Sequence, residues 1–188
     1  MKFLKLTIAS LLTSSALFAG TYNIDVSHSN VGFTVKHMMI TNVSGKFNDV
    51  AGSFEYDEKT NTLTSLSGEI IVASINTANE KRDTHLKAED IFDAEKFPKI
   101  EFKTTKIEDN AVYGDFTMKG VTKNIKLELE NGGVITDPKG NLRAGFELTG
   151  KISRKDFGIT WNKILETGGV TVGDEVKLQI AMEGILAK

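Results

Sequence analysis

The sequence predicts an all-β protein, an antiparallel barrel of about eight strands with one helical insertion. Three observations lead to this fold class. Apolar residues recur at every second position along most of the chain, short turn sequences separate these segments, and one segment near residues 77–90 lacks the alternation. Strands with one buried face show this pattern. An open sheet of so many strands would expose two long edges, and closure into a barrel removes them.

The first nineteen residues differ from the rest of the chain. Lys2 and Lys5 form a basic start, an apolar stretch ends at Phe18, and Ala19 is a small residue before polar sequence. This pattern predicts a secretory signal peptide, because the apolar part is shorter than the roughly 20 residues of a membrane-spanning helix. We expect cleavage after Ala19, with Ala16 as the alternative. The remaining residues, 20–188, then form one barrel domain in the periplasm.

Strands are expected in order along this domain. The clearest alternation lies at residues 31–35, 125–129 and 176–182, where apolar side chains alternate with Gly, Thr, Lys, Glu or Gln. Weaker alternation predicts further strands at 44–56, 63–75, 100–107, 111–118 and 142–152. Turn residues separate them, among others at 57–61, 108–110, 119–120, 131–133 and 137–140. Connections this short pair neighbouring strands as hairpins.

One segment is expected to be helical. Thr77, followed by Glu80 three residues later, has the form of a capping box, and the residues after it carry Leu86 and Ala88 without strand alternation. We predict a helix or helical turns from Thr77 to about Asp90, ended before Pro98.

A barrel of this size can be filled by its own side chains or can hold one small ligand. Small residues stand beside Phe and Ile on the strands and would leave room for a cavity; they are Gly32 or Gly68, Ala73, Gly114, Gly145 and Gly150. The alternative is that these glycines mark bulges or bends.

Composition excludes several classes of function. The 188 residues include no Cys, which excludes thiolate catalysis, Cys-ligated zinc and iron–sulfur clusters. The formal charge of -2 offers no broad positive field, so we expect no nucleic-acid partner. The sequence has no nucleophile-elbow, phosphate-loop or zinc-protease motif. His28, His37 and His85 lack the spacing of a ligand motif, so we expect no metal, no cofactor and no catalysis.

Six motifs follow one another along the chain. They are DVSHSNVGFTVKH at 25–37, GKFN at 45–48, RDTHL at 82–86, FPKIEF at 97–102, GVTK at 120–123 and SRKDFG at 153–158. In this order and spacing, residues 21–186 resemble the YceI-like family of exported bacterial proteins. The resemblance implies a lipocalin-like barrel that binds a polyisoprenoid, an isoprenoid quinone, a fatty amide or a fatty acid along its axis. It also implies a homodimer and no established reaction. The chain after residue 19 has no long apolar run, so we expect no transmembrane segment.

The resemblance implies two sets of site residues. The apolar set, expected near the tunnel, consists of Phe33, Leu86, Phe92, Phe97, Phe102, Phe157 and Trp161. The polar set, expected at the barrel mouth, consists of His28, Ser29, Lys36, His37, Arg82, Asp83, His85, Arg154 and Asp156. Arg82 or Arg154 is expected to meet an anionic head group; alternatively, an Arg82–Asp83 or Arg154–Asp156 pair holds a loop.

Met38 and Met39 depart from the family pattern. Their unbranched side chains adapt to ligands of different shape, so we add them to the expected ligand contacts. The alternative is that they pack a loop.

Periplasmic binding or transport of a long-chain amphiphile is therefore the leading hypothesis. Two others stay open. In the first, the cavity belongs to a hydrolase or isomerase that uses His28, His37 or His85 as a base. The chain would otherwise be a structural or stress protein whose barrel is filled by side chains.

Overall fold

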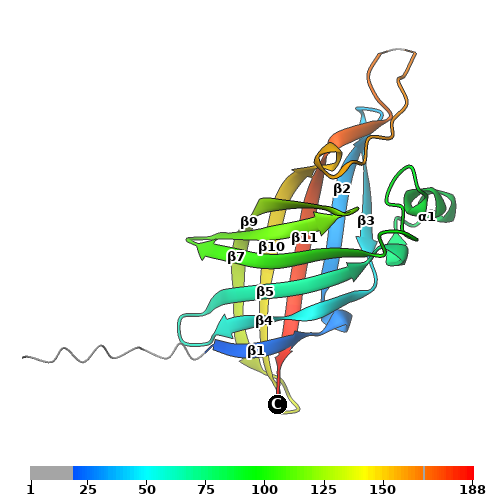
Figure 1. Ribbon diagram of the computed structural model, residues 1–188. Helices are drawn as coiled ribbons and strands as arrows, with labels where there is room; N and C mark the ends of the chain where they lie inside the picture. Colours follow the sequence, from blue (N-terminus) through cyan, green and yellow to red (C-terminus); the bar gives the residue numbers. More distant parts are fainter. Residues whose placement is uncertain (1–18, 167) are drawn as a thin grey trace, which may run out of the picture.

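The computed structural model describes residues 19–166 and 168–188, which form one antiparallel sheet closed into a barrel (Figure 1). The predicted signal peptide, except for Ala19, lies outside these residues. The closed ring passes through β1 (Ala19–Ile24), β4 (Val50–Asp57), β5 (Thr62–Ile71), β7 (Lys99–Glu108), β8 (Ala111–Met118), β9 (Val121–Thr136), β10 (Leu142–Ser153) and β11 (Val172–Leu186). β1 pairs with both β4 and β11, which closes the ring. The predicted eight-stranded antiparallel barrel is confirmed.

Three further strands extend this sheet beyond β11. They are β2 (Asn30–His37), β3 (Thr41–Phe47) and β6 (Ile75–Asn76). β1 and β2 both pair with β11, and only the short 3-10 turn η1 (Val26–His28) and its flanking residues separate them. β3 and β4 are likewise interrupted at 48–49, and β5 and β6 by η2 (Val72–Ser74). Each strand predicted at 44–56 and 63–75 is therefore two observed strands, and the chain changes direction at the interruption between them. We call these interruptions the corners.

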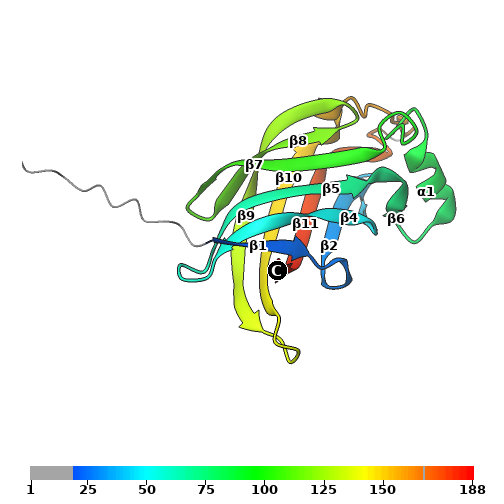
Figure 2. The same ribbon diagram turned by 60° about the horizontal axis from the view of Figure 1, so that its bottom comes forward.

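These corners change the direction of the chain. β1, β4 and β5 run across the barrel, whereas β2 and β3 turn upward alongside β11 (Figures 1 and 2). The corners thus divide the barrel into a lower part, closed by the β1–β11 pairing, and an upper part bounded by β2, β3 and α1.

The helical insertion is α1 (Glu80–Lys87), which begins later and ends earlier than the sequence predicts. Asn79, not Thr77, is the N-cap, and its side chain accepts a 3.0 Å hydrogen bond from the Arg82 backbone N–H. The Thr77 cap was wrong because Thr77 is buried and its hydroxyl donates to Asp83 Oδ1 at 2.5 Å. After Lys87 the chain continues in turns to β7. No helix in the described ranges is both long and apolar enough to cross a membrane.

The predicted turn at residues 131–133 is also wrong, because β9 continues through it. Asn131 lies opposite Phe146 and Gly133 opposite Gly145, which leaves Gly132 as the extra residue of a bulge. Asn131 Oδ1 accepts a 2.9 Å hydrogen bond from the Leu63 backbone N–H. The Asn-Gly-Gly sequence therefore bends a long strand rather than ending it.

Aromatic side chains fill the lower part of the barrel. Tyr22 and Phe54 stack with their ring centroids 5.4 Å apart, and Phe146 meets Phe54 edge-on at 5.0 Å. Tyr56 and Leu63 are fully buried beside them. This packing fills the end where β1 closes the ring.

Candidate ligand-binding site

The barrel encloses a cavity of about 320 Å³. Its wall is mainly apolar and includes Val31, Phe33, Phe47, Leu66, Ile100, Phe102, Phe116, Ile125, Leu148, Val176 and Ile180. The volume lies at the lower end of the roughly 300–1,000 Å³ typical of small-molecule sites. The interior is therefore hollow, which argues against the alternative of a barrel filled by its own side chains.

Glycines on the barrel wall help to keep the axis open. An added Cβ at Gly45 would lie 2.5 Å from Phe33 Cζ, and one at Gly114 would lie 2.2 Å from Phe102 Cζ. Each ring therefore lies against a neighbouring strand at a place where no side chain stands. Gly32 and Gly68 also line the cavity, as the first hypothesis for these glycines predicts.

Polar side chains gather at one end of the cavity. Lys36 and His37 at the end of β2 line it together with Arg82 and His85 of α1. Trp161 lies beside them, and the His85 ring meets the indole edge-on with centroids 4.9 Å apart. His85 Nε2 also lies 2.9 Å from Asp90 Oδ2. An apolar chamber thus carries these cationic and titratable groups, which we call the polar end, and its lining also includes Glu69 of β5 and Glu101 of β7.

Thr77 orients Arg82 at the polar end. Arg82 Nε donates to Thr77 Oγ1 and Nη2 to the Thr77 carbonyl oxygen, both at 2.7 Å. Asp83 accepts from the Thr77 N–H at 3.0 Å and from its hydroxyl. The predicted alternative of a direct Arg82–Asp83 pair is therefore replaced by a network through Thr77. Within the described part of the chain, Arg82 Nη1 has no hydrogen-bond partner.

Unlike Arg82, Arg154 is fully occupied by contacts within the protein. This buried side chain begins the 3-10 turn η3 (Arg154–Phe157) and donates to the carbonyl oxygens of Ile159 and Trp161, both at 2.8 Å, and of Gly173 at 2.9 Å. It also donates to Asp174 Oδ1 at 3.2 Å. Burial lowers the pKa of Arg154, and the Asp174 carboxylate opposes this shift. Arg154 therefore ties Ile159 and Trp161, which line the cavity, to the start of β11.

Comparison with known proteins identifies the family. The YceI-like domain matches residues 22–184 of the chain. The chain belongs to the YceI-like family. This YceI-like chain is 39% identical over 163 residues to the UPF0312 protein SA2479 of Staphylococcus aureus (strain N315), covering 86% of the chain and 95% of that relative.

Solved structures agree with this YceI-like assignment. The YceI protein of Campylobacter jejuni superimposes with a TM-score of 0.72 at 34% identity, covering 81% of this chain and 90% of the other. A polyisoprenoid binding domain from Saccharophagus degradans shares the fold with a TM-score of 0.67 at 12% identity, covering 88% and 98% of the two chains.

The structure brings together only part of the predicted apolar set of this YceI-like chain. Phe33, Leu86, Phe92, Phe102 and Trp161 line the cavity. The others do not line it. Phe157 is buried edge-on against Phe116, with centroids 5.3 Å apart, and Phe97 packs where a Cβ of Gly120 would stand. Met38 and Met39 are exposed on the β2–β3 turn.

Only part of the predicted polar set lies at the cavity. Lys36, His37, Arg82, His85 and Arg154 line the cavity, and Asp83 adjoins it through Thr77. Asp156 is exposed, and the ion-pair partner of Arg154 is Asp174 instead. His28 and Ser29 lie at the other end of β2 from His37. Within the described residues, the three histidines therefore do not converge on one site.

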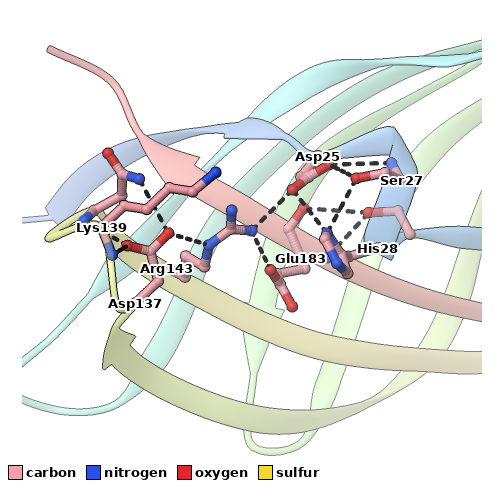
Figure 3. Close-up of polar contacts among 9 residues, drawn as sticks. Asp25, Ser27, His28, Asp137, Lys139, Arg143 and Glu183 are labelled. Carbon is pink, nitrogen blue, oxygen red and sulfur yellow. Dashed lines mark hydrogen bonds and ion pairs between the residues drawn. The ribbon is translucent and has the colours of Figure 1, made fainter.

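His28 belongs to an ion-pair network at the far end of the barrel (Figure 3). Arg143 Nη1 donates to Asp25 Oδ2 at 2.8 Å and to Glu183, and its Nε donates to Asp137 Oδ2 at 2.9 Å. His28 Nδ1 lies 2.9 Å from Asp25 Oδ2. Asp25, His28 and Glu183 are grouped as metal ligands can be, but the Arg143 guanidinium already bridges the two carboxylates.

Hydrogen bonds in this network stabilise the charged carboxylates. Ser27, then Arg143 and His28, lower the pKa of Asp25. Asn141, then Arg143, lower the pKa of Asp137. The network therefore ties η1, the β9–β10 turn and β11 together and is a structural feature of the closed end.

Sequence reasoning missed much of the cavity wall. Val31, Phe47, Leu66, Ile100 and Phe116 lie outside the predicted apolar set but line the cavity. Their alternation was visible in the sequence and would have placed them on an inward face. Which faces reach the open part of the barrel depends on the position of the corners.

Proposed function

We propose that this YceI-like domain binds a long-chain amphiphile, with the hydrocarbon tail inside the barrel and the head group at the polar end. The observation that carries the proposal is an apolar cavity whose lining includes Lys36, His37, Arg82 and His85. The description of a protein with the same fold as a polyisoprenoid binding domain supports it.

The energetics of tail burial suit such a cavity. Each buried methylene contributes roughly 0.8 kcal/mol, so about ten contribute on the order of 8 kcal/mol. Ordering the tail and restricting its motion offset part of this gain, which leaves an affinity near micromolar at best. Polyisoprenoids, isoprenoid quinones, fatty amides and fatty acids all supply such a tail.

Arg82 is the residue we propose to meet the head group. Two of its three guanidinium nitrogens already donate to Thr77, the third, Nη1, has no partner among the described residues, and Arg82 lines the cavity. Lys36 and His85 belong to the same polar end and favour a phosphate, a carboxylate or a strongly polar carbonyl. Arg154 is not proposed for this role, because its donors are used by backbone carbonyls and Asp174.

We further propose that residues 1–19 direct export, that the domain of residues 20–188 carries its ligand in the periplasm, and that it acts without catalysis. The homodimer implied by the family resemblance stays a prediction, which light scattering of the purified protein checks.

Native mass spectrometry of protein purified without detergent, followed by organic extraction, tests the proposal. We expect a bound species whose extract contains a long-chain amphiphile. A protein that is empty and that also ignores added quinone and fatty-amide analogues would contradict it.

Substitution of Arg82 tests the head-group assignment separately. Arg82→Gln is expected to weaken binding of an anionic long-chain ligand about tenfold, because a charge-assisted hydrogen bond contributes about 1.5–3 kcal/mol. Lys81→Gln, an exposed neighbour on α1, is the control and should bind as the native protein does. Unchanged binding by Arg82→Gln, measured by titration, would exclude Arg82 as the head-group contact.

A further inference from the structure

Two loops expose apolar side chains at one end of the barrel. One is the β2–β3 turn with Met38, Met39 and Ile40, and the other is the segment between η3 and β11, which carries Ile164. The exposed fraction is 57% for Met39, 81% for Ile40 and 86% for Ile164. We call these four residues the apolar tip.

The two loops lie side by side. The Met38 backbone N–H donates to the Thr171 carbonyl oxygen at 2.8 Å, and Met39 Cγ lies 3.4 Å from where a Cβ of Gly169 would stand. Both loops project from the same end of the barrel in Figure 1. The apolar side chains therefore form one projecting surface rather than scattered exposures.

The β2–β3 turn holds two methionines in a strained backbone conformation. Met38 and Met39 have φ of 47° and 64°, and the Ile40 N–H closes the turn on the His37 carbonyl oxygen at 3.1 Å. Two-residue turns with positive φ at both central positions ordinarily carry Asn and Gly, because other side chains are strained there. Strain without burial of the side chains indicates a role outside the folded chain itself.

The apolar tip adjoins the polar end of the cavity. His37, which precedes Met38, and Thr171, which pairs with it, both line the cavity. Lys36 and Lys163 lie at the bases of the two loops, and neither forms an ion pair within the described residues. The described part of the second loop carries one acidic residue, Glu166. The tip is thus apolar at its end and basic at its base.

We propose that the apolar tip inserts into the surface of a phospholipid bilayer and holds the polar end of the cavity against it. A stable protein partner buries about 800 Å² on each side and needs a matching surface, which two narrow loop ends do not offer. A bilayer requires only apolar side chains that enter it and basic groups that reach its phosphates. Docking in this way would let an amphiphile pass between membrane and cavity; this purpose rests on the proposed function, whereas the tip geometry does not.

Flotation with vesicles of phosphatidylethanolamine and phosphatidylglycerol tests the proposal. The native protein should float with the vesicles. The double variant Ile40→Ser/Ile164→Ser should bind the vesicles at least about tenfold more weakly, because two apolar side chains are lost. Ile135→Ser is the matched control, since Ile135 is 70% exposed near the end of β9, away from the tip. It should float as the native protein does.

Three results would overturn the proposal. They are a native protein that does not float, a double variant that floats equally well, and a native dimer that the double variant converts to monomer. The last result would make the tip a self-association surface instead.

A second variant separates docking from folding. Met38→Asn/Met39→Gly places residues suited to positive φ in the turn, so we expect Tm to stay the same or rise while flotation weakens. Flotation that is unchanged in this variant would contradict insertion of the methionines.

Mass spectrometry without vesicles keeps this proposal distinct from the proposed function. Protein that carries a ligand but ignores vesicles contradicts docking alone. Protein that floats with an empty cavity contradicts ligand binding alone.

Discussion

Phe33 and Phe102 show how single residues shape the cavity. Both are large apolar side chains on alternating strands, and each lies over a glycine of a neighbouring strand. Because both rings line the cavity, they contribute apolar surface to it. Substitution of such a ring changes the lining of the cavity directly.

Phe102→Asp is expected to abolish ligand retention, because it places a charge among apolar groups. Phe33→Asp should act in the same way. Ligand content by native mass spectrometry and stability by thermal melting measure the effect. Lys126→Ala, an exposed residue of β9, is the control and should change neither. If Phe102→Asp kept both full stability and full ligand content, the inward assignment of that side chain would be wrong.

Arg154→Ala is expected to lower the free energy of unfolding by about 3 kcal/mol, because it leaves the buried Ile159 carbonyl oxygen and the half-buried carbonyl oxygens of Trp161 and Gly173 without this donor. Chemical denaturation measures this loss. Lys155→Ala removes an exposed contact with the same Asp174 and should cost less than about 1 kcal/mol. Equal losses in the two variants would contradict the buried role of Arg154.

The corners explain why the positions of the strands along the sequence were easier to predict than the places where the chain changes direction. Alternation continues through residues 44–56 and 63–75, so each reads as one strand, although η2 and residues 48–49 interrupt the pairing. The Asn-Gly-Gly sequence of β9 reads as a turn, but Asn131 and Gly132 form a bulge held by Leu63. Local sequence describes the residues of a bend; only the partner strand decides whether the chain turns back.

The network around Arg143 should make the closed end sensitive to acid. The pKa values of Asp25 and Asp137 are lowered in the folded protein, so their contribution is present above the unfolded value near 4 and is lost as pH falls through the folded values. We therefore expect stability to fall steadily below about pH 4. Urea denaturation across this range measures it.

Arg143→Gln should weaken this dependence, because Arg143 is a major cause of both shifts. The variant is expected to be less stable at neutral pH and to lose less on acidification. Lys151→Gln, which removes an exposed pair with Glu175, is the control. An unchanged acid profile in Arg143→Gln would show that the network does not govern acid stability.

The barrel as a unit combines a packed end and an open end. Tyr22, Phe54 and Phe146 fill the part closed by β1, and the cavity beside them is lined by residues of β2, β3, α1 and all eight ring strands. The cavity-lining residues beside Phe146 are Leu148 and Met182, so a tail that enters from the polar end meets these side chains as its floor. The length of tail that the cavity accepts is limited by that floor.

Affinity should rise with tail length and then level off. Each added methylene should strengthen binding by up to about 0.8 kcal/mol until the cavity of about 320 Å³ is full. Competition against a fluorescent fatty-acid analogue, using a series of fatty amides, measures this. A flat series from the shortest tail onward would show that the tail does not occupy the cavity.

The sequence by itself determined the all-β class, the barrel closure, the helical insertion and the family. Period-two alternation and turn residues are properties of the local sequence, and they can be recognised without knowing how the strands pair. Motif order carried the family because it covers nearly the whole domain.

Only the tertiary structure decided which motif residues share a site. His28 and His37 belong to one motif, yet they lie at opposite ends of β2. Arg82 and Arg154 are chemically alike, but Arg154 donates to backbone carbonyls and Asp174, whereas Arg82 Nη1 has no partner among the described residues. Alternation shows which residues share a face of a strand, whereas position along the barrel axis depends on long-range pairing and on where the corners fall.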